Sequence, residues 1–89
     1  MPTASWHVYI VECADRTLYT GVAVDLPDRL ARHNAGTGAR YTRGRGPVRL
    51  VYSEAAVDRS EAQRREHAIK RLSTPAKRRL IAAKGMTVS

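Results

Sequence analysis

Hydrophobic and polar positions alternate near the N-terminus of this chain and follow a helical period further on. Two short runs of β-branched and aromatic residues, with a polar break between them, predict a β-hairpin over 6–21. With a three-residue loop at 14–16, Tyr19 lies opposite Val11, and Tyr9 is the diagonal neighbour of Tyr19 on the same face. A two-residue turn would place the two phenols on opposite faces. Two phenols directed at one point can form an active site, although tyrosines in a hairpin are more often ordinary strand residues.

The next segment predicts a helix that begins after the N-cap Asp25 and ends near His33. Its apolar face carries Leu26 and Leu30, and the same spacing places Arg29 and His33 on that face. A cation beside an apolar stripe costs stability unless it is paired or has a function. Arg29 and His33 are therefore candidate site residues beside the hairpin. The alternative for Arg29 is that its chain snorkels from the edge of the stripe.

A third strand and two more helices are predicted in the second half of the chain. Residues 48–53 alternate between an apolar and a mixed face, as a strand with one buried face does. Asp58 is a helix N-cap, and Thr74 is predicted to cap a last, basic helix with Pro75 at its first position. The helix after Asp58 is expected to bury three apolar residues: Ala62, Ile69 and Leu72.

Glu66 borders that apolar stripe, four residues after Ala62. A carboxylate in such a position is either a metal ligand or half of an ion pair with Arg65, Lys70 or a more distant arginine. The residues alone favour the ion pair.

Composition limits the kind of protein. Eighty-nine residues make one small domain, expected over 6–84 with loose tails at 1–5 and 85–89. Sixteen Lys and Arg against eight Asp and Glu give a net charge of +8, which favours nucleic acid as partner, ahead of an anionic membrane. The apolar run at 8–11 is too short to cross a bilayer and the N-terminus lacks a signal-peptide pattern, so we expect a cytoplasmic protein. A single cysteine, Cys13, excludes an internal disulfide.

The loop over 36–47 is rich in glycine and arginine. From Arg29 to Arg49, both included, the chain has six arginines and no acidic residue. The planar guanidinium of arginine can bind two phosphate oxygens at once. A tyrosine that lies between arginines can stack on a base while the arginines contact the neighbouring phosphates. The alternative is a flexible, solvated loop. The nucleic-acid contacts predicted in this loop are Arg40, Tyr41, Arg43 and Arg45.

Several of these features together resemble one known family. They are, in chain order, His7-Val8-Tyr9, Tyr19-Thr20-Gly21, Asp25 to Leu30, Ala39-Arg40-Tyr41-Thr42 and the late Glu66. At these spacings the set is similar to the GIY-YIG nuclease family, in particular to its small stand-alone bacterial members. The resemblance implies an α+β fold. Its three-stranded antiparallel sheet would be flanked by helices in the order β-β-α-β-α-α.

The resemblance also implies chemistry. It assigns Tyr9 and Tyr19 to water activation, Arg29 to phosphate stabilisation, His33 to a further polar role and Glu66 to binding Mg²⁺ or Mn²⁺. A single carboxylate is compatible with Mg²⁺, which keeps several waters. We add Lys70 to the expected nucleic-acid contacts. The implied activity is a divalent-metal-dependent endonuclease in DNA repair or recombination. Because the 89 residues hold no second domain that would choose the substrate, we expect single-stranded or branched DNA rather than a defined duplex sequence.

The chain departs from the family pattern at three places. Val22 follows the Tyr-Thr-Gly element where many relatives have a basic residue, the first motif is His7-Val8-Tyr9 in place of Gly-Ile-Tyr, and the single asparagine is Asn34. These departures keep a second hypothesis open, namely a catalytically weak or inactive nucleic-acid-binding module on the same fold.

Overall fold

The computed structural model describes residues 6–84, and the two predicted loose tails lie outside the described residues. The predicted order β-β-α-β-α-α is confirmed, with one added 3-10 turn. The elements are β1 (Trp6–Glu12), β2 (Leu18–Ala23), α1 (Leu26–Asn34), η1 (Arg40–Thr42), β3 (Arg49–Ala56), α2 (Arg59–Lys70) and α3 (Thr74–Lys84).

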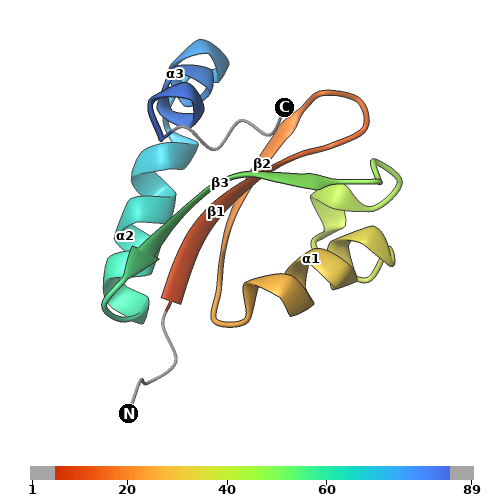
Figure 1. Cartoon of the computed structure of the whole chain (residues 1–89), viewed down its shortest axis with the longest axis horizontal. Helices are drawn as coiled ribbons and strands as arrows, with labels where there is room; N and C mark the ends of the chain where they lie inside the picture. The colour runs from red at the N-terminus through yellow and green to blue at the C-terminus, as the bar shows by residue number, and fades with distance from the viewer. Residues whose placement is uncertain (1–5, 85–89) are drawn as a thin grey trace.

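The three strands form one antiparallel sheet in the order β2-β1-β3, so β1 is central. Helix α1 lies on one side of the sheet, and α2 with α3 lies on the other (Figure 1). The alternation along β1 divides its side chains between two cores. Val8 and Ile10 pack in the core that contains Ile69 of α2, whereas Tyr9 and Val11 pack in the core that Leu30 of α1 covers.

Local signals explain the helix starts. The Asp25 carboxylate accepts a hydrogen bond from the Asp28 backbone N–H at 3.0 Å, and Asp58 caps α2 through the Glu61 N–H at 2.8 Å. The Glu61 side chain in turn accepts a hydrogen bond from the Val57 N–H at 2.7 Å. Two of the three helix caps predicted from the sequence, Asp25 and Asp58, are therefore confirmed.

Three details differ from the sequence predictions. Strand β3 begins one residue later and runs three residues further than the predicted 48–53, because β1 continues to pair with it as far as Trp6 and Ala56. The cap of α3 is Ser73, since its hydroxyl accepts from the Ala76 N–H at 3.3 Å, so the prediction of Thr74 is wrong. Leu72 is 39% exposed and does not belong to the buried stripe, because α2 ends at Lys70 and the chain turns before Leu72 can reach the sheet.

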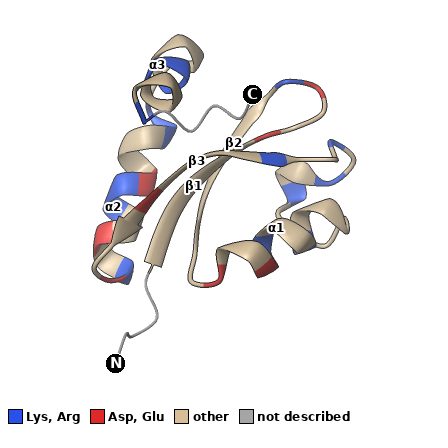
Figure 2. Ribbon diagram, viewed as in Figure 1, with Lys and Arg blue, Asp and Glu red and all other residues tan. Residues whose placement is uncertain are grey.

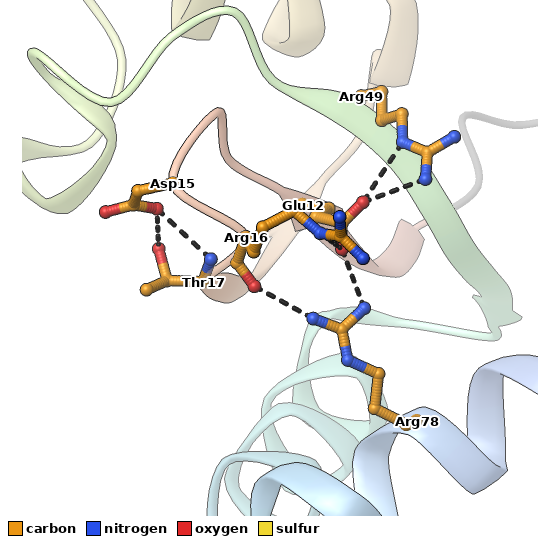
Figure 3. A network of polar contacts seen from close by, with 6 residues as sticks. All are labelled: Glu12, Asp15, Arg16, Thr17, Arg49 and Arg78. Carbon is orange, nitrogen blue, oxygen red and sulfur yellow. Dashed lines mark hydrogen bonds and ion pairs between the residues drawn. The ribbon is translucent and has the colours of Figure 1, made fainter.

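A buried carboxylate links the end of β1, the start of β3 and the middle of α3. Glu12, at the end of β1, accepts hydrogen bonds from Arg49 at the start of β3 at 2.8 Å and from Arg78 of α3 at 2.7 Å (Figure 3). Arg16 in the hairpin loop adds a third pairing at 3.3 Å. Hydrogen bonds from Arg78 and then Arg49 lower the pKa of Glu12 to about 2. Sequence reasoning missed this cluster, because its members are far apart along the chain.

Among the described residues, no helix is both long and apolar enough to cross a membrane.

Candidate active site

The hairpin places its two tyrosines as the three-residue loop predicts. Cys13 N–H donates to the Thr17 carbonyl at 2.8 Å, and Tyr19 pairs with Val11. Tyr9 is therefore the diagonal neighbour of Tyr19, and their ring centroids lie 6.4 Å apart. The two phenols share the face of the sheet that α1 covers.

Two glycines allow the aromatic groups to approach the backbone closely. Gly21 pairs with Tyr9, and a Cβ at Gly21 would lie 2.7 Å from the phenolic oxygen of Tyr9. A Cβ at Gly38 would lie 2.5 Å from Nδ1 of His33. The Tyr9 ring therefore lies across β2 over Gly21, and the loop after α1 passes directly over the His33 ring.

His33 links the hairpin to the loop. Its Nε2 lies 2.8 Å from the Tyr9 hydroxyl, and its Nδ1 lies 2.8 Å from Oγ1 of Thr42. The side chain is almost fully buried. Burial, and secondly the nearby positive charge of Arg29, lower the pKa of His33, so the ring is neutral at neutral pH.

Tyr9 is also fully buried, and burial raises the pKa of its phenol to about 12. Arg29 opposes this rise because its positive charge favours the phenolate, whereas Tyr19 and the Glu66 carboxylate add to it. In the free protein Tyr9 is therefore protonated.

Arg29 is half-buried rather than extended into solvent. Its Nη1 donates to the Val22 carbonyl at 3.0 Å. It lines a cleft of about 520 Å³ together with Tyr19 and His33. The guanidinium is therefore held at the cleft by a specific contact, which simple snorkelling from the stripe does not require.

Glu66 belongs to α2, which packs on the edge strand β2 from the side of the sheet opposite to α1. Its carboxylate is 3.1 Å from the Lys70 ammonium, which in turn lies 5.9 Å from the Tyr19 ring centroid. One of the three ion-pair partners raised from the sequence, Lys70, is thus present in the structure. The Lys70 end of the pair lies beside Tyr19.

The donor set near Glu66 limits which metal it can hold. Within residues 6–84, no group of three or more His, Cys, Asp or Glu side chains is placed to bind a metal. A zinc-type site with four protein ligands does not fit this arrangement. Mg²⁺ does fit, because it often takes one or two carboxylates, keeps several waters and accepts further oxygens from substrate phosphates.

The predicted nucleic-acid contacts fall into two groups. Tyr41 stacks on Tyr19 with ring centroids 5.9 Å apart and carries the Arg45 guanidinium 4.4 Å from its centroid, while Arg45 also pairs with Asp15 at 2.5 Å. Arg40 and Arg43 are exposed, and their side chains have no hydrogen-bond or ion-pair partner among the described residues. Figure 2 shows basic residues in this loop beside α1 and also on α2 and α3. The two unpaired arginines are therefore the ones free to meet phosphates.

Thr42 is the buried residue of this site to which sequence reasoning gave no role. It belongs to the Ala39-Arg40-Tyr41-Thr42 segment, which contributed to the family resemblance. Hydrogen-bond partners nine residues apart across a loop give no periodic signal, so its contact with His33 could not be read from the sequence.

Together, the fold and this cleft define a small α+β domain with paired hairpin tyrosines beside an arginine, a histidine and a glutamate. The family model for the GIY-YIG catalytic domain matches residues 5–79 of this chain. The chain therefore belongs to the GIY-YIG family, as the sequence motifs predict.

Relatives of similar size support this assignment. The chain is 56% identical over 80 residues to the UPF0213 protein DP2720 of Desulfotalea psychrophila, which covers 89% of this chain and 73% of the relative. It is 50% identical over 80 residues to the UPF0213 protein CPE1444 of Clostridium perfringens, covering 90% and 86%. Across most of the chain the likeness is thus to other small proteins.

Two solved structures have the same fold. The solution structure of the UPF0213 protein BH0048 from Bacillus halodurans matches with a TM-score of 0.60 at 46% identity, over 91% of this chain and 86% of that one. The solution structure of the protein EF2693 from E. faecalis matches with a TM-score of 0.61 at 34% identity, over 92% and 88%. The predicted fold class is therefore confirmed.

Proposed function

We propose that this protein is a Mg²⁺- or Mn²⁺-dependent endonuclease that hydrolyses DNA phosphodiester bonds, in DNA repair or recombination in the cytoplasm. The observation that carries the proposal is the 2.8 Å contact between the Tyr9 hydroxyl and Nε2 of a neutral His33, beside Arg29. This arrangement offers a proton acceptor and a cation at one point, as phosphodiester hydrolysis requires.

The proton path follows from that contact. The attacking water gives a proton to the Tyr9 oxygen while the Tyr9 proton passes to His33 Nε2. Since Tyr9 is fully buried in the free protein, this step requires that substrate binding opens the phenol to the cleft that Tyr19 and His33 line. Because the phenol exchanges one proton for another, it need not become a free phenolate, which its pKa of about 12 would make costly. The resulting hydroxide bonds to phosphorus, the bond from phosphorus to the leaving sugar oxygen breaks, and that oxygen takes a proton from solvent.

Arg29 and Glu66 are proposed to stabilise the negative charge of the transition state, Arg29 directly and Glu66 by holding a metal. The Arg29 guanidinium, held by the Val22 carbonyl, stabilises the negative charge that grows on the phosphate oxygens. A metal at Glu66 would supply further positive charge and lower the pKa of a bound water. Tyr19, on the cleft wall, is proposed to contact the substrate, and Arg40 and Arg43 to hold the neighbouring phosphates.

A second candidate is a nucleic-acid-binding module with little activity. The observation that favours it is the Lys70 ammonium 3.1 Å from Glu66, where it competes with a metal for the same carboxylate. On this reading the basic surface binds nucleic acid and the site turns over slowly or not at all.

A cleavage assay separates the two. Purified protein is incubated with single-stranded, duplex and branched DNA, with Mg²⁺, Mn²⁺ or EDTA. The endonuclease proposal expects metal-dependent products that Tyr9→Phe abolishes, and it favours single-stranded or branched DNA. Binding to all three DNAs without metal-dependent products would support the binding module and contradict the proposal.

A further inference from the structure

Behind His33, away from the proposed reacting groups, lies a hydrogen-bonded threonine that the mechanism has not used. Thr42 is 1% exposed, and its Oγ1 has two neighbours, Nδ1 of His33 at 2.8 Å and the Ala39 carbonyl oxygen at 2.9 Å. The Thr42 N–H also donates to the Ala39 carbonyl at 3.1 Å. The hydroxyl is therefore held in place by the backbone of the short 3-10 turn.

These two neighbours favour one placement of the hydrogens. A carbonyl oxygen can only accept, so the 2.9 Å contact with Ala39 needs the single hydroxyl hydrogen of Thr42. The Thr42 oxygen is then left as an acceptor towards His33, which requires a hydrogen on Nδ1. A neutral imidazole carries one N–H, so Nε2 has a free lone pair and accepts the hydrogen of the Tyr9 hydroxyl.

The opposite tautomer does not suit this network. With its hydrogen on Nε2, His33 would turn Nδ1 into an acceptor, and the one hydroxyl hydrogen of Thr42 could then satisfy either Nδ1 or the Ala39 carbonyl but not both. This tautomer therefore loses one buried hydrogen bond that the Nδ1–H tautomer keeps. Gly38 closes the space above Nδ1, because even a Cβ there would be 2.5 Å away, so the loop also limits movement of the ring.

We propose that Thr42 is a positioning residue that holds His33 in the Nδ1–H tautomer, so that Nε2 is ready to receive the proton of Tyr9. This inference rests on the proposed function for its catalytic consequence, though the tautomer itself does not depend on it. Thr42 touches no substrate and acts only through His33. Its loss should therefore slow the chemical step and leave substrate binding largely unchanged.

The test combines a spectroscopic and a kinetic measurement on the full chain. Long-range ¹H–¹⁵N NMR correlations of the imidazole report which ring nitrogen carries hydrogen. Wild type should show His33 as the Nδ1–H tautomer. Thr42→Val, which keeps the shape and removes the hydroxyl, should lose this preference, and Thr42→Ser should restore it.

The matched control is Thr20→Val. Thr20 is equally buried, pairs with Ile10 on the other face of the sheet, and its hydroxyl has no hydrogen-bond partner among the described residues. This substitution should leave the His33 tautomer and the cleavage rate as in wild type.

In the cleavage assay, Thr42→Val should lower kcat by between about 10-fold and 10⁴-fold with little change in KM, the range found when a group that orients a histidine is lost. Thr42→Ser should recover most of the rate. If wild type cleaves no DNA, the proposed function fails, yet the NMR measurement still decides the role of Thr42. An Nε2–H tautomer in wild type overturns the proposal without any variant. The proposal is also overturned if a folded Thr42→Val variant keeps the wild-type tautomer of His33 or the wild-type kcat.

Discussion

The Tyr9 ring lies so close to the backbone of Gly21 that a Cβ there would be 2.7 Å from the phenolic oxygen and 2.8 Å from Cζ. The Tyr-Thr-Gly element therefore ends in glycine because the partner strand carries a tyrosine whose ring needs that space. A bulge is not the reason, since pairing between β1 and β2 continues without a register shift on both sides of Gly21.

Gly21→Ala should push the Tyr9 hydroxyl away from His33. We expect an unfolding free energy lower by about 1–3 kcal/mol, as for overpacking in a core, and cleavage reduced at least about 10-fold because the proton acceptor is misplaced. The control is Gly36→Ala, which strains a backbone at φ +82° but meets nothing within 4 Å. Equal loss of activity in the two folded variants would contradict the prediction.

Glu66→Gln should remove metal-dependent cleavage and leave DNA affinity the same or higher. The amide keeps the shape of the side chain but loses the charge that would hold Mg²⁺, and removal of an anion cannot repel phosphate. Melting temperature, DNA affinity and cleavage are measured on one preparation. The control is Glu61→Gln on the same helix, where glutamine can still accept the Val57 N–H. A destabilised but still active Glu66→Gln would show that Glu66 serves as an ion-pair partner.

Lys70→Met should increase the affinity of the protein for Mg²⁺. The ammonium lies 3.1 Å from the Glu66 carboxylate, so the metal must displace it, and removing the competitor favours the metal. The Mg²⁺ affinity is measured by titrating Mg²⁺ and monitoring the NMR chemical shifts of Glu66, so the measurement does not depend on cleavage. DNA binding by the same variant should weaken, because one predicted phosphate contact is lost. Unchanged Mg²⁺ affinity would mean that the ion pair does not compete with the metal.

Arg40→Ala with Arg43→Ala should weaken DNA binding equally for all sequences, since phosphate contacts carry no sequence information. The slope of log K for DNA binding against log salt concentration should become less steep by roughly 1.4 for single strands and 1.8 for duplex DNA. This follows from two lost phosphate contacts at about 0.7 or 0.9 each. The charge-matched control is Arg59→Ala with Arg64→Ala on the exposed side of α2. The same slope change in both pairs would show that binding follows total charge and not the loop.

The Glu12 cluster predicts acid sensitivity. Hydrogen bonds from Arg78 and Arg49 lower the pKa of Glu12 from 4.5 to about 2, so the folded state binds this proton more weakly than the unfolded state. The stabilisation is therefore present above pH ~4.5 and is lost as pH falls towards ~2, and we expect it to be on the order of 1–3 kcal/mol.

Denaturant unfolding of wild type and Glu12→Gln between pH 2 and 7 measures this contribution. The variant should be less stable at pH 7, and the difference between the two proteins should shrink as pH falls. A difference that stays constant over this range would show that Glu12 acts through packing alone.

The sequence by itself determined the helix caps at Asp25 and Asp58 and the order of the elements, because each depends on neighbours within a few residues or on a fixed period. For the hairpin it left two registers open, and the structure has the one with the three-residue loop. The sequence also supplied the motifs that identify the family. The tertiary structure alone decided that Tyr9 is buried against His33 and that Thr42 lies behind that ring. It also showed that Arg45 pairs with Asp15 and lies over the Tyr41 ring, while the side chains of Arg40 and Arg43 have no such partner among the described residues. Hydrogen bonds and burial of this kind join residues that are distant along the chain. Their geometry depends on how a helix and a loop pack on the sheet, and no local pattern records it.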